Sequence, residues 1–429
     1  MTAVPAGPAP QNAGGLFGAR LFLIMSSGYL MSYGLRAINA TIAPELVGEL
    51  TLSNTELGSL TSAYFLAFAC MQLPLGVLLD RFGPRRVDSV LIALAGIGCL
   101  TFAIASTFWE LWLARALLGL GFSGALMASF ALFRIWFAPH QQTRLAAWTL
   151  MVGTAGVLIA TLPVRALLQV IDWRGVFLGC AVVLLAISLL MWFGLPRSRE
   201  PHPGDARPFL ESLSGYRDVV RSSFFWRMVL LSGAVQGGFT ALQTLWLGPW
   251  FTRVLQMTPQ QSASWLFLFN AVLLGSYLLA GYLAPRVGAH EGATVRVSAI
   301  AALATVVLFA FIAAVPEVAG VWAWLAVAAV STVFPPIQAR VGMSFPKHLG
   351  GRALTAYNLV VFVSIFVVQA GLGVVIDWLV GRGMSQADAF RAALAGLALV
   401  LLGFWVFFIR WPVRPSNVTP PLPPEKRTP

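Results

Sequence analysis

Apolar residues form long continuous runs along nearly the whole chain, separated by short stretches that carry most of the polar and charged residues. A helix needs about 20 mostly apolar residues to cross the hydrocarbon core of a bilayer. Because the runs are continuous and do not alternate, they exclude the two-residue period of a membrane β-barrel. The pattern predicts twelve transmembrane helices, at roughly residues 18–43, 57–79, 87–106, 108–136, 144–170, 174–194, 225–252, 262–285, 293–315, 320–341, 352–378 and 388–411.

The composition supports this interpretation. Of the 429 residues, 58% are hydrophobic and only 10% are charged. A soluble globular protein carries about 25% charged residues, so the bilayer is the solvent that accounts for this composition. Inside a bilayer every backbone polar group has to be paired within the protein, and helices meet this demand. We therefore expect an all-α, multi-pass membrane protein with the lipid bilayer as its surroundings.

Positive charge is distributed unevenly between the two sets of loops. Most of the 28 lysines and arginines fall in the two tails and in the loops that lie on the same side of the membrane as the N-terminus. The exceptions are Arg165, Arg174, Arg253, Arg382 and Arg391 on the other side, and Arg36 and Arg115 within spans. Cytoplasmic loops carry an excess of Lys and Arg. We therefore predict that both termini are cytoplasmic, in a bacterial inner membrane. The net charge of +12 then reflects topology, and we expect no nucleic-acid partner.

Two internal similarities at one offset divide the chain into halves. Gly76–Gly83 resembles Gly281–Gly288, and Val170-Ile-Asp-Trp173 recurs as Val375-Ile-Asp-Trp378, in both cases 205 residues further on. A polar, basic linker separates the sixth and seventh runs. We predict a disordered tail (1–15), a six-helix bundle (16–195), a cytoplasmic linker (196–224), a second six-helix bundle (225–411) and a disordered tail (412–429). Paired repeats are typical of secondary transporters, whose substrate site lies between the halves.

The loop GVLLDRFGPRR after the second span resembles the signature of the major facilitator superfamily, roughly G-x-L-x-D-R-x-G-x-R-R. Arg115-Ala-Leu-Leu-Gly119-Leu-Gly121 resembles the superfamily's R-x-x-x-G-x-G pattern, and Asp172-Trp-Arg174 is also similar to it. The resemblance implies two six-helix bundles and alternating access. It assigns conformational gating to Gly76, Asp80, Arg81, Gly83, Arg85, Arg86 and Arg115.

The residues of this loop and of the fourth span also have roles that follow from helix geometry and charge. Gly76 would let a neighbouring helix approach closely, and Asp80 can face a helix N-terminus, where a carboxylate is favoured. The second copy has Pro285 in place of the aspartate, so any latch there is built differently. For Arg115 an interhelical bond is an equal alternative. Gly119–Gly124 spells a dinucleotide fingerprint, but it lies inside a span without a preceding strand, so we interpret it as close helix packing.

Arg36 is the main candidate for a substrate contact. An arginine at the centre of a membrane helix costs about 2.5–3.5 kcal/mol on insertion scales, so it normally faces a cavity or a partner. Tyr29 and Tyr33 share its helical face, and Gln236 and Gln243 form a similar stripe in the seventh span. The predicted substrate contacts are Arg36, Tyr33, Tyr29, Asn39, Gln236, Gln243, Asn270, Asn358 and Gln369.

For these residues a structural role is the alternative. Arg36 could bond to carbonyls or to Asn39, and the amides could form interhelical hydrogen bonds.

The acidic residues and the setting of Arg36 narrow the transporter class. None of the sixteen Asp and Glu lies in the middle of a predicted span. Four stand at span ends, namely Asp80, Asp88, Asp172 and Asp377, and the others lie in loops or tails. Proton coupling through a buried carboxylate therefore has no obvious carrier. The Y-x-x-R pattern resembles the organic anion:cation symporters and the organophosphate antiporters. The symporters usually have Asp where this chain has Leu35, and the antiporters add a basic residue in the seventh span.

Three functions remain open. The first is a secondary transporter of a small organic anion, a carboxylate-type metabolite, working by rocker-switch alternating access. The second is an exporter of amphipathic drugs or metabolites, favoured by Trp246, Trp250 and the Phe-rich helices. The third is a non-transporting sensor with a carrier fold. The resemblance implies a monomer and a coupling ion, either a proton or an exchanged anion.

We expect no enzyme activity, no cofactor and no metal site. Each of the three cysteines stands alone in a different span, and the four histidines fall in separate loops. These residues are Cys70, Cys99, Cys180, His140, His202, His290 and His348.

Overall fold

A computed structural model of the chain describes residues 15–196, 216–287, 293–334, 338, 341–342, 344–345 and 347–411. The two tails and most of the linker, for which we expect disorder and a cytoplasmic connection, lie outside these residues. The described residues are almost entirely helical, and none of them is in a β-strand. The all-α prediction is therefore confirmed.

The first half of the chain forms six membrane passes, several of them broken. Its helices are α1 (Gly15–Ala37), α2 (Asn39–Leu50), α3 (Asn54–Ile104), α4 (Phe108–Phe122), α5 (Ala125–Trp136), α6 (Pro139–Ile159), α7 (Leu162–Leu167) and α8 (Trp173–Gly194). The first pass bends by 47° between α1 and α2. The long α3 holds the second and third passes, because Gly83 interrupts it with φ at +76°. Only glycine adopts such a conformation at little cost.

The second half repeats this plan. Its helices are α10 (Ser223–Ala241), the π-helical turn η1 (Leu242–Trp246), α11 (Leu247–Arg253), α12 (Pro259–Val287), α13 (Ala293–Ala314), α14 (Pro316–Ser331), α16 (Lys347–Val380) and α17 (Gln386–Arg410). The π turn begins at Leu242, 205 residues after Ala37, where α1 ends. The offset of the sequence repeat therefore relates two helix breaks.

Twelve passes account for the described helices. Eight helices are long and apolar enough to span a bilayer, and the bent pair α1–α2 adds a ninth. The remaining passes come from the second pass within α3, from the interrupted segment α10–η1–α11 and from the shorter α14. The predicted number of membrane helices is thus confirmed within the part of the chain that the structure describes.

Helix starts on the side opposite to the termini are fixed by short polar caps. Ser53 and Glu56 form a capping box at the start of α3, and Thr107 and Glu110 form another at α4. Each box satisfies backbone N–H groups that the first helical turn leaves without partners. These caps therefore fix the residues at which α3 and α4 begin.

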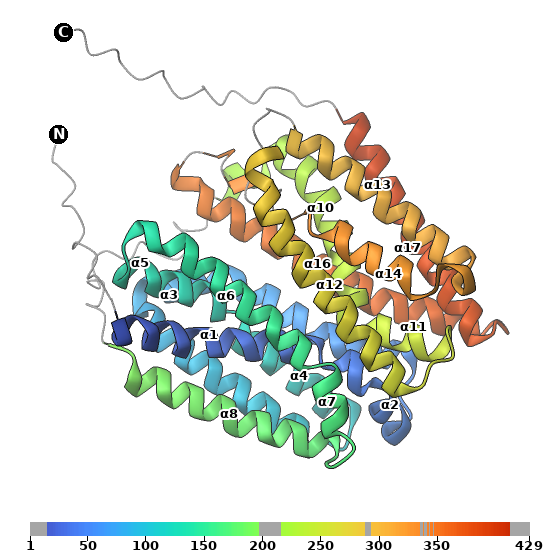
Figure 1. Ribbon diagram of the computed structural model, residues 1–429, viewed down its shortest axis with the longest axis horizontal. Helices are drawn as coiled ribbons and strands as arrows, with labels where there is room; N and C mark the ends of the chain where they lie inside the picture. The colour runs from blue at the N-terminus through green and yellow to red at the C-terminus, as the bar shows by residue number, and fades with distance from the viewer. Residues whose placement is uncertain are drawn as a thin grey trace, which may run out of the picture.

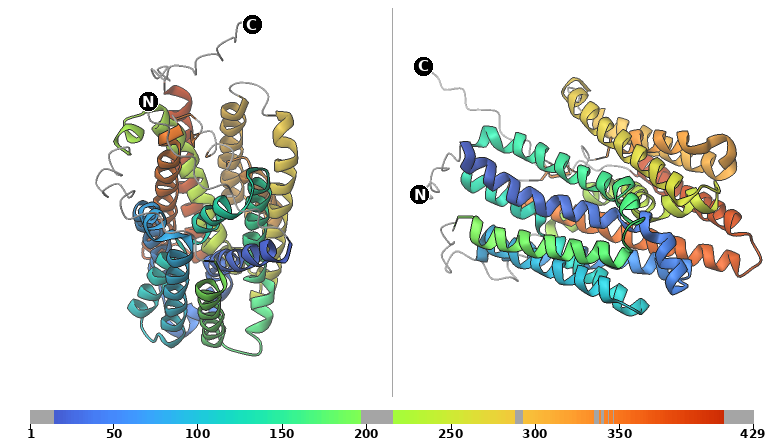
Figure 2. Two further views of the ribbon diagram at one scale, coloured as in Figure 1. Left: turned by 90° about the vertical axis from the view of Figure 1, so that its left-hand side faces the viewer. Right: turned by 60° about the horizontal axis from the view of Figure 1, so that its bottom comes forward.

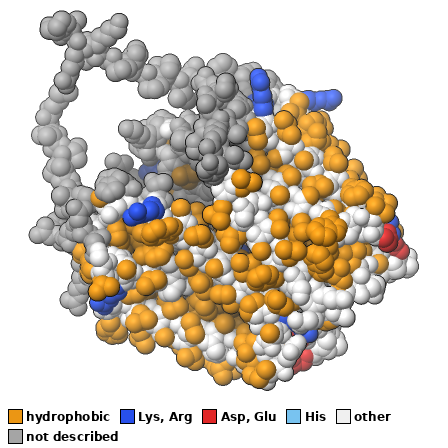
Figure 3. All heavy atoms as spheres, viewed as in Figure 1, with side chains coloured by type: hydrophobic (Ala, Val, Ile, Leu, Met, Phe, Trp, Pro, Cys, Tyr) orange, Lys and Arg blue, Asp and Glu red, His pale blue; other side chains and the backbone are white. Residues whose placement is uncertain are grey.

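The two halves form two bundles that lie side by side. In Figure 1 the first half, blue to green, fills the lower part and the second half, yellow to red, fills the upper part. Figure 2 shows that the helices of both bundles run in roughly one direction. Hydrophobic side chains cover much of the face in Figure 3, and the few visible charges lie near its margins. This surface suits contact with lipid.

We call the end where α1 begins and α17 ends the basic end, and the end that carries Thr51–Asn54 and Arg253–Thr258 the opposite end. Contacts between the halves involve α3 with α16, and α2, α6 and α7 with η1, α11 and α12.

Candidate functional site

Arg36 lies at the junction of the two halves, surrounded by aromatic rings. Its guanidinium carbon is 4.6 Å from the centre of the Tyr33 ring, 5.6 Å from that of Tyr64 and 5.4 Å from that of Phe68. The fourth ring, Phe362, belongs to α16 of the second half and lies at 5.6 Å. We call these four rings the aromatic cage. Such rings attract a cation through their negative faces.

The cage joins the halves directly. The rings of Phe68 and Phe362 stack with their centres 4.2 Å apart, one from each half. Tyr64 and Phe68 are one helical turn apart on α3 and therefore point the same way. A ligand bound at Arg36 would touch residues of both bundles, as alternating access requires.

Arg36 has no acidic partner among the described residues. The described chain forms ion pairs at Arg165, Arg174 and Arg391, but none at Arg36. The Nε atom of Arg36 is buried and has no hydrogen-bond partner. The expected alternative of a bond to Asn39 is not found, because Asn39 is fully buried and donates to Thr61 Oγ1 at 2.7 Å. Arg36 thus supplies an uncompensated positive charge at the junction.

The second intramembrane arginine supports the bend that presents the first. Arg115 of α4 is fully buried and donates from Nη1 to the carbonyl of Leu35 at 2.8 Å. Leu35 stands just before the break between α1 and α2, where a regular helical partner is lost. The guanidinium also lies over the rings of Phe102 and Phe177, 4.9 and 5.7 Å away. The interhelical bond that we weighed for Arg115 is therefore present.

The predicted stripe on α1 is only partly directed at the site. Tyr33 belongs to the cage, whereas Tyr29 is 3% exposed and packs its ring 4.8 Å from that of Tyr33. Tyr277 of α12 is a neighbour of Tyr29 and Tyr33. The residues that sequence reasoning missed are Tyr64, Phe68, Phe362 and Tyr277. Only the pair on α3 carried a signal, its four-residue spacing.

Most of the predicted amides are already paired with other protein groups. Gln243 donates to Asn270 at 2.7 Å, and Asn358 accepts from Gln338 at 2.7 Å. Gln369 is fully buried and donates to Thr244 at 3.3 Å. Gln236 is half-buried. These pairs match the interhelical hydrogen bonds weighed as the alternative for each amide.

At the opposite end the halves are joined by a carboxylate. Asp377 of α16 accepts hydrogen bonds from the side-chain amide of Asn54 at 2.7 Å and from the backbone N–H groups of Asn54 and Thr55 at 3.3 and 2.6 Å. Arg253 of α11 donates to the Asn54 side-chain oxygen. An aspartate of one half therefore sits on the N-terminus of a helix of the other, where negative charge is favoured.

Glycines let the two backbones meet at this end. A Cβ added at Gly58 would lie 2.7 Å from the carbonyl oxygen of Gln369 in the other half. Cβ atoms at Gly373 and Gly248 would overlap the carbonyl oxygens of Asn54 and Ala40. The structure is therefore tightly packed between the halves at the opposite end.

The signature loop at the basic end differs in part from expectation. A Cβ at Gly76 would meet no atom within 4 Å, so the expected close approach of a helix there is wrong in this structure. Asp80 and Arg81 are exposed. Arg85 donates from Nε to the carbonyl of Trp192 at 2.9 Å, at the C-terminal end of α8, where a cation is favoured. Gly83 is the break that turns the chain back.

Glycines of the fourth pass pack closely, as predicted. A Cβ at Gly119 would overlap the backbone of Tyr64, and one at Gly121 would lie 2.5 Å from the backbone nitrogen of Ala95. α4 therefore lies directly against α3. The dinucleotide spelling is explained by helix packing.

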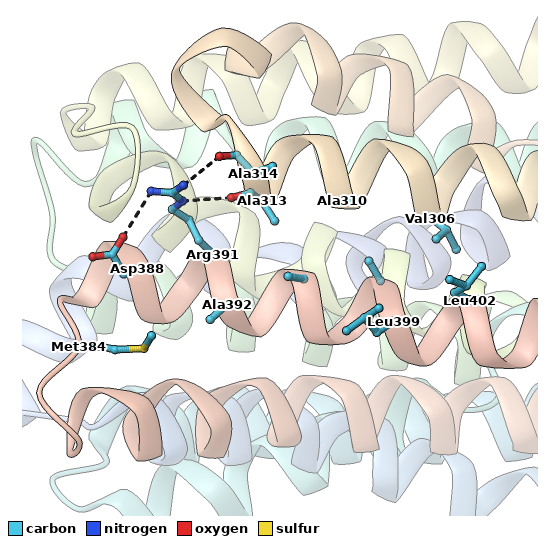
Figure 4. A pocket seen from close by; sticks show the side chains of 12 residues that line it. Val306, Ala310, Ala313, Ala314, Met384, Asp388, Arg391, Ala392, Leu399 and Leu402 are labelled. Atoms are coloured by element: carbon cyan, nitrogen blue, oxygen red, sulfur yellow. Dashed lines mark hydrogen bonds and ion pairs between the residues drawn. The ribbon is translucent and has the colours of Figure 1, made fainter.

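One hollow lies away from Arg36. It has a volume of about 570 Å³ and runs between α13 and α17, lined mainly by alanine, leucine and valine (Figure 4). Arg391 at its mouth is held by the carbonyls of Ala313 and Ala314, at 3.0 and 2.9 Å, and by Asp388. This arginine is already paired and the rest of the lining is almost entirely apolar, so we assign no substrate to the groove. Among the described residues no group of His, Cys, Asp and Glu could hold a metal ion.

The chain resembles known transporters. A sequence model of the Major Facilitator Superfamily matches residues 25–369. The chain is 30% identical over 258 residues to the "Probable nitrate/nitrite antiporter NarK1" of Thermus thermophilus, a match covering 57% of this chain and 56% of that protein. It is 29% identical over 243 residues to the "Probable L-galactonate transporter" of Escherichia coli K12, covering 53% and 51%. The chain thus spans about half the length of these relatives.

A solved structure shows the same fold. The crystal structure of a bacterial homolog to the human lysosomal transporter Spinster matches with a TM-score of 0.73, covering 92% of this chain and 97% of that chain at 15% identity.

Proposed function

The chain belongs to the Major Facilitator Superfamily, and we propose that it is a secondary transporter that binds a small organic anion at Arg36 and moves it by rocker-switch alternating access. The observation that carries this proposal is the uncompensated guanidinium at the junction of the halves, with an aromatic cage drawn from both. A cation within a membrane-spanning helix is unfavourable without a counter-charge. An anionic substrate would supply that charge.

The chemistry of the site favours a substrate with one negative group. One arginine offers a planar fork of donors that matches a single carboxylate. Two of the four rings carry hydroxyl groups and two are phenylalanines, so a small anion at Arg36 would meet both polar and apolar surface. The two relatives are named for nitrate or nitrite and for L-galactonate, which are anions, and this agrees with the proposal.

The alternative of an amphipathic-drug exporter loses its main support. Trp246 and Trp250 are 2% and 3% exposed. Trp246 donates to the Gln369 carbonyl at 3.0 Å, and the Trp250 ring packs 5.6 Å from Trp324. Both tryptophans are therefore packing residues and do not line a binding surface. We retain the sensor as an alternative that a flux measurement separates from a carrier.

The orientation follows from charge. We propose that the basic end faces the cytoplasm of a bacterium, that both termini lie there and that the protein acts as a monomer in the inner membrane. The support for this orientation is the excess of Lys and Arg on that side. A single cysteine placed at exposed Met384, in a background without native cysteines, should react with an impermeant maleimide added outside whole cells. Labelling only after lysis would reverse the assigned orientation.

Thermal stabilisation of purified protein tests the substrate class. A ligand present at 100 times its Kd stabilises the folded state by about 2.7 kcal/mol. Nitrate, L-galactonate and a panel of small monocarboxylates are the probes, with neutral sugars and amphipathic cations as the other arms. At least one anion should raise the Tm of wild type and have no effect on Arg36→Ala.

Two further variants make this test specific. Arg36→Lys keeps the charge but loses the fork and should show a weakened response. Arg382→Ala removes an exposed arginine that lies 3.6 Å over the Trp378 ring and should respond as wild type does. Equal stabilisation of wild type and Arg36→Ala by the active anion would refute the site, and stabilisation by neutral compounds alone would favour the exporter. Binding without flux in liposomes would favour the sensor.

A further inference from the structure

Asp88 is an acidic residue that is fully buried inside the first bundle. It lies near the basic end of the third pass, five residues after the break at Gly83, and its residue is 0% exposed. Both of its side-chain oxygens are buried and neither has a hydrogen-bond partner. From the sequence we expected no buried carboxylate, because this residue stands at a span end. Asp88 is nevertheless buried, because the bundle covers this end of the span.

The surroundings of Asp88 are apolar. A Cβ added at Gly124 would lie 3.4 Å from Asp88 Oδ1, and its other nearest neighbours would be side-chain atoms of Leu75 and Leu91. These two leucines belong to one hydrophobic cluster. Gly124 belongs to the junction between α4 and α5, so the carboxyl group faces a helix break. On the side of α8, Ser188 donates to the carbonyl of Ser89 at 2.8 Å and does not reach the carboxyl group.

Among the described residues, no hydrogen bond or ion pair of Asp88 offsets this burial. The nearest basic residues in sequence are Arg85, which donates to the Trp192 carbonyl, and Arg86, which is exposed. Asp80 interacts with Arg134 at the surface. An ionised carboxylate without a partner in such a place is strongly disfavoured, so the neutral acid is the form that this conformation accommodates.

We propose that Asp88 is a proton-binding site of the transport cycle, holding a proton in this conformation and releasing it when the α4–α5 junction moves away. In the release step the carboxyl O–H bond breaks, the proton passes to water at the basic end and a carboxylate remains. No other reactant is needed. Resting on the function proposed above, uptake of the proton while the opposite end is open and its release at the basic end would move one proton with each monovalent anion, and transport would then be electrically neutral.

Infrared spectroscopy tests the protonation state without any substrate. Wild type at neutral pH should show the C=O stretch of a protonated carboxyl group, shifted by exchange into D2O, and Asp88→Asn should lack that band. Asp172→Asn, which removes an exposed carboxylate at the start of α8, is the matched control and should keep the band. If the wild-type band is missing, or persists in Asp88→Asn, the proposal is overturned. Asp88→Ser is the second variant should Asp88→Asn fail to fold.

A conformational measurement tests the coupling. Spin labels at exposed Gln169 and Met384, one in each half at the opposite end, report the opening of that end. Raising the pH should shift the distance distribution of wild type, whereas Asp88→Asn should keep the low-pH distribution at every pH. An unchanged pH response in Asp88→Asn would overturn the coupling. Because neither measurement uses an anion, a failure of anion binding at Arg36 would be recognised separately.

Discussion

The hydrogen bonds of Asp377 predict how firmly the opposite end is closed. Replacing Asp377 by alanine removes three hydrogen bonds to α3, two from backbone N–H groups and one from the Asn54 amide. Loss of a cap-like side chain costs about 1 kcal/mol. A hydrogen bond to a charged group adds about 1.5 kcal/mol. Because the site is partly exposed, we take the net loss as about 2–3 kcal/mol for the closed state relative to the open one.

That loss corresponds to a large shift in population. A change of 1.36 kcal/mol is tenfold in an equilibrium constant, so the ratio of closed to open molecules should fall roughly 30- to 150-fold. Asp377→Asn keeps one acceptor oxygen and should have a smaller effect. Double electron–electron resonance between labels at Gln169 and Met384, in a chain without Cys70, Cys99 and Cys180, should show longer distances for Asp377→Ala.

The sequence repeat offers the control. Asp172 occupies the equivalent position of the first half, but its carboxylate accepts from Gly175 of its own helix at 2.7 Å. Asp172→Ala removes a comparable cap without touching the junction, so its distances should match wild type. The reasoning is refuted if Asp377→Ala leaves the distances unchanged, or if Asp172→Ala lengthens them equally.

Three further substitutions test other parts of the structure. Gly156→Ala would place a Cβ on the Leu30 carbonyl and should lower stability by about 1–3 kcal/mol, seen as a lower Tm, whereas Gly179→Ala, which meets no atom within 4 Å, should not. Gly83→Ala forces a side chain into a conformation, φ +76° and ψ 158°, that is almost exclusive to glycine, and should cost about 1–3 kcal/mol; a Tm equal to wild type would contradict the strain. Arg115→Met should weaken anion affinity through the bend of the first pass, and Arg115→Lys should restore part of it; undiminished affinity in Arg115→Met would exclude that role.

The continuous apolar runs predicted the number of passes, and the similarities at one offset predicted the two halves. The position of Gly119–Gly121 inside a span predicted close helix packing. Backbone pairing inside a bilayer leaves few alternatives to helices, so long apolar runs suffice for the architecture. Arg36 could also be singled out, because a cation within a span is costly and therefore has a purpose. The aromatic partners could not, since Phe362 comes from the other half and no spacing along the chain relates it to Arg36.

The repeat shows where sequence stops being informative. Asp172 and Asp377 share one tetrapeptide at one offset, and by sequence they are equivalent. In the folded chain one caps its own helix and the other joins the two halves. Asp88, at the end of an apolar run, is likewise buried only because α4 and α5 cover it. Hydrophobicity along the chain determined which segments cross the membrane. The partner of each polar group was decided by contacts between distant helices, which only the tertiary structure brings together.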